Sequence, residues 1–248
     1  MTARPTALPD TDVVAAALRE ELAAVAGRQA VPRVLDVGGG SGTWAVPLAV
    51  HGCEVTVVDS SANALAVLRS RARDAGVADR VRAVQADVDA LADVTGGLGA
   101  DLVLGHGLLE YVDDPAGAVH ALAAATAPGG LVSVLVAGRH AAVLARVVAG
   151  RVSEARRLLA DPDGRAGPGD QLLRRMETEE VRALVEAEGS LVVERVQGHR
   201  VLADLVPDHA ADGGVALADL TALEELAAVT PPLRDLASRI HVLARRTP

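Results

Sequence analysis

The sequence predicts an α/β protein: a doubly wound, Rossmann-like, mostly parallel seven-stranded sheet with helices on both faces and an antiparallel last strand. Short apolar runs typical of buried strands recur at intervals of about 20 to 30 residues from Arg33 onward. Stretches rich in alanine, leucine and arginine, which favour helices, separate these runs. This alternation is typical of βαβ units, whose parallel strands are covered on both faces.

The N-terminal segment, residues 1–30, is predicted to be helical because apolar residues recur at helical spacing from Val13 to Val25. Residues 31–137 follow as a core with five strands. Within this core, the turn Ala127-Pro128-Gly129-Gly130 ends one helix and precedes the fifth strand. The predicted strands are Val34 to Val37, Val55 to Val58, Val81 to Val84, Leu102 to Leu104 and Leu131 to Val136.

Residues 138–190 are predicted to form a helical cap or lid after the fifth strand. This segment contains a helix from His140 to Ala160, a loop from Asp161 to Asp170 and a helix from Thr178 to Glu188. The loop is rich in glycine, proline and aspartate, and we expect it to be mobile and to lie near the mouth of a cleft. Residues 191–248 complete the sheet, so that residues 1–248 form a single domain. They contain a strand from Leu191 to Val196, a long helical stretch through Leu226 and a strand from Ile240 to Ala244.

The composition limits the compartment and the partners of the chain. The net charge is -9 and every one of the 24 basic residues is arginine, which argues against a broad phosphate-binding surface. The single cysteine, Cys53, excludes an intramolecular disulfide and a multi-cysteine zinc site, and we expect no metal. The apolar stretches are too short to span a bilayer and the N-terminus has no signal-peptide pattern, so we expect a cytoplasmic protein without a membrane partner. The sequence does not indicate the oligomeric state.

A glycine-rich loop follows the first predicted strand, where open α/β sheets bind nucleotide-like ligands. Two patterns fit it. Asp36, Gly38, Gly40 and Gly42 match the methyltransferase pattern, in which an acid precedes G-x-G-x-G by two residues. Gly40, Gly42 and Ala45 also satisfy a relaxed dinucleotide-binding pattern. The second pattern is disfavoured because a chain without lysine cannot supply the Tyr/Lys proton donor common in hydride-transfer enzymes.

Polar residues at the ends of the next three strands also favour the first pattern. Asp59 ends the second strand, where it is placed to accept hydrogen bonds from ribose hydroxyls. Asp87 and Val88 follow the third strand, where an acid beside an adenine ring reads its amine and an apolar side chain packs on its face. The fourth strand runs into His106. Structural roles stay open, since Asp59 and Asp87 each precede a predicted helix that they would cap, and His106 is also typical of a packed core histidine.

This ordered set resembles the class I S-adenosylmethionine-dependent methyltransferases over residues 30–137. The resemblance implies S-adenosyl-L-methionine as the cofactor. It also implies cofactor-binding roles for the residues that match the family's motifs. These are Asp36, Gly38, Gly39, Gly40, Gly42, Asp59, Ser60, Asp87, Val88 and His106.

The chain is similar, in particular, to the tRNA 5-carboxymethoxyuridine methyltransferases, which esterify the carboxylate of a modified wobble uridine in tRNA. It departs from that family at Tyr111, where a tryptophan is usual, at Ala137-Gly138, where Tyr-Asn is usual, and in Asp161 to Arg175, where a lysine-rich loop is usual. The matching segments are Asp36-Val37-Gly38-Gly39-Gly40, His106 to Val112, Gly130 to Gly150, Gly198-His199-Arg200-Val201 with Asp204, Leu223-Glu224 and Ile240-His241-Val242.

A carboxylate acceptor is ionised at neutral pH and needs an orienting arginine but no general base. We expect Arg200 to hold it, with His106 as the other catalytic candidate, and Tyr111, Arg139 and His140 as further acceptor-binding residues.

Three hypotheses about the function remain. They are a carboxyl O-methyltransferase acting on tRNA or a related nucleoside acid, a small-molecule methyltransferase of secondary metabolism, and a cofactor-binding protein without catalysis. The expected partner is therefore tRNA or a small anionic acceptor.

Overall fold

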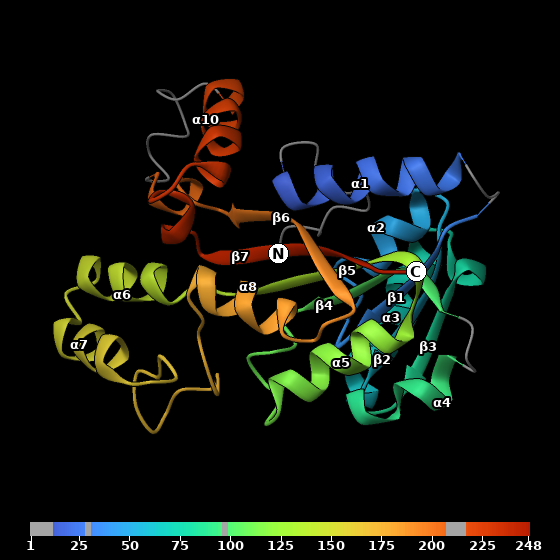
Figure 1. The fold of residues 1–248 in the computed structure, drawn as a ribbon, viewed down its shortest axis with the longest axis horizontal. Coiled ribbons are helices and arrows are strands. Elements are labelled where there is room, and N and C mark those ends of the chain that lie inside the picture. Colours follow the sequence, from blue (N-terminus) through green and yellow to red (C-terminus); the bar gives the residue numbers. More distant parts are fainter. Residues whose placement is uncertain (1–11, 28–30, 96–98, 207–216) are drawn as a thin grey trace.

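The computed structural model describes residues 12–27, 31–95, 99–206 and 217–248 and shows a twisted seven-stranded sheet between layers of helices (Figure 1). The strand order is β3-β2-β1-β4-β5-β7-β6. β1 to β5 are parallel, and β7, the last strand of the chain, pairs antiparallel with both β5 and β6. The predicted fold class is therefore confirmed, including the antiparallel last strand.

All seven predicted strands form, and most extend beyond the apolar runs that indicated them. The strands are β1 Arg33–Val37, β2 Glu54–Asp59, β3 Val81–Gln85, β4 Ala100–His106, β5 Thr126–Ala137, β6 Leu191–His199 and β7 Arg239–Arg246. The helices are α1 Val13–Ala26, α2 Ala45–Val50, α3 Ala62–Asp74, α4 Leu91–Thr95, α5 Pro115–Ala125, α6 Arg139–Val148, α7 Val152–Ala160, α8 Thr178–Glu186 and α10 Leu217–Val229.

Successive strand residues face opposite sides of the sheet, and each side has its own core. Val34 and Leu102 pack with α1, α2 and α3 on one face, while Leu35 and Val103 pack with α4, α5 and α8 on the other. Strands of this kind are apolar on both faces, which is why they read as continuous apolar runs in the sequence. Because α8 covers the sheet, the cap proper consists of α6, α7 and the loop after them.

The cap differs from the prediction, because the single helix expected from His140 to Ala160 is two helices. α6 ends at Val148, and Gly150, in the left-handed region at φ 72°, turns the chain into α7. The amide of Arg151 donates to the carbonyl of Arg146 and so closes the end of α6. In Figure 1 the two helices lie side by side beyond the end of β5.

Two further expectations need correction. The segment from Ala127 to Gly130, predicted as a turn, belongs to β5, where its register against β4 shifts. The long helical stretch expected to end at Leu226 is interrupted, because β6 continues to His199 and a short 3-10 turn spans Ala203–Leu205. The middle of that stretch, residues 207–216, lies outside the described residues. In the described ranges, no helix is long and apolar enough to cross a membrane.

The two sides of helix α3 give a test of the core. Leu65 is 1% exposed in the core beneath α3, whereas Val67 on the same helix is 50% exposed. We expect Leu65→Ala to lower the free energy of unfolding by about 2–5 kcal/mol because it leaves a cavity. The matched control Val67→Ala should change it by less than about 0.5 kcal/mol. Urea unfolding followed by circular dichroism measures both, and equal effects would contradict the assigned packing.

Candidate functional site

A cavity of about 910 Å³ opens at the carboxyl ends of β1 to β4, and we call it the edge cavity. It lies where the strand order reverses between β1 and β4, the position at which open α/β sheets bind ligands. Its volume is that of a pocket for a cofactor-sized molecule. Lining residues are Val37, Gly38, Val58, Asp59, Ser60, Ser61, Ala64, Ala86, Asp87, Val88, Asp89, Gly107, Leu108, Tyr111, Val112, Asp113 and Asp114.

The glycine loop needs glycine for two separate physical reasons. Gly40 has φ 54°, in the left-handed region that other residues rarely adopt. At Gly39 the reason is space, because a Cβ there would lie 2.4 Å from Oδ2 of Asp36. The loop therefore folds directly over the Asp36 carboxylate, and a residue larger than glycine at position 39 would clash with this carboxylate.

Asp36 is a buried carboxylate without a hydrogen-bond partner. It is 1% exposed, and neither of its carboxylate oxygens has a partner among the described residues. Burial, reinforced by the charge of Asp59, raises the pKa of Asp36 to about 7. An unpaired buried carboxylate is costly, and a cation bound beside the glycine loop would offset that cost.

Asp59 joins the glycine loop to the end of β2. Its Oδ2 accepts a hydrogen bond from the amide of Gly40 at 2.8 Å, and its Oδ1 accepts one from the amide of Ser61 at 2.8 Å. The helix-cap alternative does not apply, because Ser61 supplies the cap of α3. Asp59 lines the edge cavity, and each of its oxygens retains a lone pair for a ligand hydroxyl.

Asp87 and Val88 lie together on the wall of the edge cavity, and their expected contacts with an adenine ring stay predictions. Oδ1 of Asp87 accepts a hydrogen bond from the amide of Val88 at 2.6 Å and caps the short 3-10 helix Val88–Ala90. The capping role and the cavity position therefore coexist, since Oδ2 of Asp87 is not used by the cap. Val88 is 9% exposed and presents an apolar surface beside it.

His106 ends β4 next to the lining residue Gly107, does not itself line the edge cavity, and is held in a network with the buried Ser133 and His241. Its Nε2 contacts the Ser133 hydroxyl at 2.7 Å, and that hydroxyl contacts Nε2 of His241 at 2.8 Å. The indole of Trp44 packs edge-on against the His106 ring at a centroid distance of 4.8 Å. Burial and the neighbouring His241 hold the pKa of His106 well below its ordinary range, so the ring is neutral and a weak base.

Arg239, which the sequence analysis did not single out, lies beside the edge cavity without lining it. It begins β7, and because β7 is antiparallel, this first residue lies at the carboxyl edge of the parallel strands. A Cβ on the cavity residue Gly107 would lie 3.5 Å from Nη1 of Arg239. Within the described ranges its guanidinium has no ion pair, although its charge partly offsets the rise that burial causes in the pKa of Glu110. The available signal was its place next to the matching segment Ile240-His241-Val242.

The other predicted acceptor-binding residues are divided between the cavity and its surroundings. Tyr111 lines the edge cavity and is 59% exposed. Arg200 does not line it, and its guanidinium pairs with Asp204. Arg139 donates to the carbonyls at the end of α7, among them that of Asp161, and His140 contacts the carbonyl of Asp235 at 3.3 Å. Acceptor binding by Arg200, Arg139 and His140 therefore stays a prediction.

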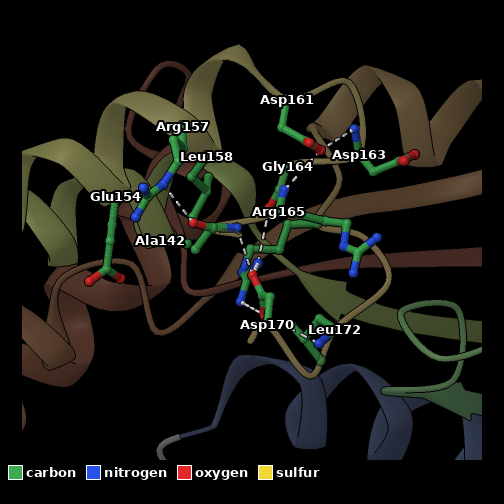
Figure 2. Close-up of polar contacts among 12 residues, drawn as sticks. Ala142, Glu154, Arg157, Leu158, Asp161, Asp163, Gly164, Arg165, Asp170 and Leu172 are labelled. Carbon is green, nitrogen blue, oxygen red and sulfur yellow. Dashed lines mark hydrogen bonds and ion pairs between the residues drawn. The ribbon is translucent and has the colours of Figure 1, made fainter. Parts of the chain in front are cut away.

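Residues 166–170 of the loop from Asp161 to Asp170 line a second cavity together with Tyr111, and the expected position of the loop at the cleft mouth stays a prediction. The segment that follows it is tied to the loop after β4: Leu173 donates its amide to the carbonyl of Glu110, and Arg174 donates to the carbonyls of Leu109 and Val112. Asp161 stabilises the loop itself by accepting from the amides of Asp163 and Arg165 (Figure 2). The expected mobility of the loop stays a prediction.

The charges of the edge cavity fit a cationic cofactor. Its lining includes five aspartates and, among the described residues, no arginine or histidine. The unpaired Asp36 lies under the adjoining glycine loop. S-adenosylmethionine carries a sulfonium and an ammonium group together with ribose hydroxyls, so the carboxylates of Asp36 and Asp59 suit it. No group of three or more metal-ligating side chains gathers within the described part of the chain.

Comparison with known proteins agrees with this geometry. A family described as "Methyltransferase domain" matches residues 11–189. The chain is 34% identical over 120 residues to a tRNA 5-carboxymethoxyuridine methyltransferase of Escherichia coli K12, covering 48% of this chain and 45% of that one. It is 41% identical over 109 residues to a ubiquinone biosynthesis O-methyltransferase of Pectobacterium atrosepticum, covering 44% of each. The matches thus span less than half the length of these relatives.

Solved structures share the fold. The CcbJ methyltransferase of Streptomyces caelestis superposes with a TM-score of 0.61 at 17% identity, covering 100% of this chain and 94% of that one. A magnesium protoporphyrin IX methyltransferase of Synechocystis superposes with a TM-score of 0.55 at 13% identity, covering 94% and 85%. At such identities the likeness concerns the fold alone.

Asp59 tests the assignment of the edge cavity. We expect Asp59→Ala to weaken S-adenosylmethionine binding about 10- to 100-fold, because it removes acceptors for ribose hydroxyls and frees the Gly40 amide. Asp89→Ala, which removes another carboxylate of the same lining, is the matched control and should change affinity less than about threefold. Isothermal titration calorimetry gives both values. Equal effects would show that only the total charge of the cavity matters.

Asp36 predicts a pH dependence of cofactor binding. Its pKa of about 7 in the free protein should fall when a cation binds, because the cation stabilises the carboxylate. Below about pH 7, binding should therefore release a proton, and affinity should rise with pH until it levels off above that value. Calorimetry in buffers of different ionisation enthalpy measures this proton release, which the substitution Asp36→Asn should abolish. Proton release that persists in Asp36→Asn would assign the effect to another group.

Proposed function

The chain belongs to the methyltransferase domain family and is an S-adenosylmethionine-dependent methyltransferase, and on this premise we propose that its acceptor is a carboxylate, which becomes a methyl ester. The observation that carries the proposal is Arg239, whose guanidinium has no ion pair among the described residues and lies beside the cavity residue Gly107, although Arg239 does not itself line the cavity. The tRNA-modifying relative supports it, since its name specifies a carboxymethoxy substrate.

The side chains near Gly107 are the charged Arg239 and the neutral His106, and they suit an acceptor that is already ionised. When bound, S-adenosylmethionine supplies an electrophilic methyl group on a cationic sulfur. The acceptor oxygen forms a bond to the methyl carbon while the carbon–sulfur bond breaks, and no proton moves. The neutral, weakly basic His106 is poorly suited to deprotonate a hydroxyl. This disfavours the alternative of a hydroxyl acceptor, which the ubiquinone-pathway relative would imply.

Arg239 is better placed than Arg200 to hold the carboxylate. Arg200 begins the turn after β6, has φ 56° and is bound to Asp204, which also accepts from the Ser238 hydroxyl at 2.6 Å. This cluster supports the start of β7 and therefore the position of Arg239. A planar guanidinium at the rim binds a carboxylate through two hydrogen bonds and fixes its orientation.

The carrier of the carboxylate is either tRNA or a small molecule, and the charge favours the latter. The net charge of -9 and the five aspartates of the edge cavity repel a polyanion. Methyl-labelled S-adenosylmethionine distinguishes the acceptors. We would offer undermethylated tRNA and a panel of small carboxylic acids, then treat the products with mild alkali. A methyl ester releases its label as methanol, whereas a label stable to alkali would refute a carboxylate acceptor.

Arg239→Gln tests the role of the guanidinium. We expect kcat/KM for the acid to fall about 10- to 100-fold with unchanged cofactor affinity, because charge-assisted hydrogen bonds to the carboxylate are lost. Arg200→Gln makes the same change of charge at the same sheet edge and should have a smaller effect. A larger loss in Arg200→Gln would instead assign the carboxylate to Arg200, as the sequence predicted.

A further inference from the structure

A second cavity, of about 540 Å³, lies within the cap and meets the edge cavity at Tyr111, which lines both. We call it the cap cavity. Its walls come from the end of α6, from α7 and from the loop that follows α7 (Figure 2). Its charged lining residues are Arg146, Arg151, Glu154, Arg157, Asp170 and Arg175.

The two acids of the cap cavity leave its arginines only partly neutralised. Asp170 is fully engaged with Arg175, whose Nη1 and Nη2 donate to the two carboxylate oxygens at 2.6 and 3.0 Å. Both side chains of this pair are buried, and it fixes the loop. Glu154 is shared, since it binds Arg151 at 2.9 Å and lies 3.8 Å from Nε of Arg146.

Arg157 has no carboxylate partner within the described ranges. Its Nε donates to the carbonyl of Ala166 at 3.1 Å, which anchors the side chain at the cavity wall. In the part of the chain that the structure describes, its two terminal amino groups make no hydrogen bond. In Figure 2, Arg157 and Glu154 extend from α7, with Asp170 on the facing loop. Against the three arginines Arg146, Arg151 and Arg157 stands the single carboxylate of Glu154, which contacts Arg146 and Arg151 but not Arg157, and the local charge is positive.

The two adjoining cavities are opposite in charge. The edge cavity is lined by aspartates, and the cap cavity has an excess of arginine. The carboxylate that is methylated has Arg239 beside it, but a second anionic group of the acceptor would be repelled by the aspartates of the edge cavity and attracted by the arginines of the cap cavity. Because Tyr111 lines both cavities, a single acceptor that occupied both would lie against this side chain.

We infer that the cap cavity binds a carboxylate or phosphate group of a small acceptor, distant from the group that is methylated. The inference rests on the proposed function, since it takes the edge cavity as the cofactor site. The size of the cavity and its small charge excess suit one anionic group, whereas the flanking aspartates disfavour a nucleic-acid backbone.

Inorganic phosphate is a direct probe, titrated into the full chain by calorimetry at constant ionic strength. We expect saturable binding that Arg157→Gln weakens at least about tenfold, because it removes the guanidinium without a carboxylate partner. Arg156→Gln makes the same change of charge at the next position of α7, outside the cavity lining, and should alter binding less than about twofold. Glu154→Gln should strengthen binding, since it removes the competing carboxylate.

Several outcomes would overturn the inference. The first is phosphate binding that does not saturate, and the second is an equal loss of phosphate affinity in Arg157→Gln and Arg156→Gln. The third is tight tRNA binding that Arg157→Gln abolishes, which would identify an RNA occupant. The alkali test on the same proteins separates this inference from the proposed function. A label stable to alkali refutes the carboxylate acceptor while phosphate still binds, whereas a labile label without phosphate binding refutes only the cap site.

Discussion

The Asp59 carboxylate is the interaction on which the shape of the site depends. One of its oxygens fixes the glycine loop after β1 through Gly40, and the other fixes the start of α3 through Ser61. The two loops would otherwise be independent segments at the end of neighbouring strands. With both segments held, the glycine loop covers Asp36 closely. The buried Asp36 carboxylate has no hydrogen-bond partner among the described residues, so the site favours a cationic ligand that binds beside it.

The remainder of the site consists of two regions of opposite charge at one edge of the sheet. The loops after β2, β3 and β4 bring acids to the edge cavity, and the cap brings arginines to its neighbour. The strand β7 contributes because it runs antiparallel, so that its first residue, Arg239, reaches the same edge as the last residues of the parallel strands. The net charge of the chain conceals this arrangement, since the two regions are opposite in sign.

Buried parallel strands are predictable because both of their faces are apolar, and the apolar runs at Val34 and Leu102 located them correctly. Motif residues at strand ends, such as Asp59 and Asp87, were predictable for the same reason: once strands are placed, their carboxyl ends share one edge. The break between α6 and α7 was missed because Gly150 is compatible with a helical pattern until its φ is known. Arg239 was missed because its place depends on an approach to Gly107, which is distant in the sequence, and the cap cavity was missed because it forms only once the break after α6 lets α7 and the following loop fold back.

The aromatic content of the chain has a practical consequence for spectroscopy. With one tryptophan, one tyrosine and no phenylalanine, all of its aromatic absorbance and intrinsic fluorescence arise beside the site. Trp44 lies against the His106 ring next to the glycine loop, and Tyr111 lies where the two cavities meet. The native protein thus carries one optical reporter near each part of its site, and ligand binding can be followed without an added label.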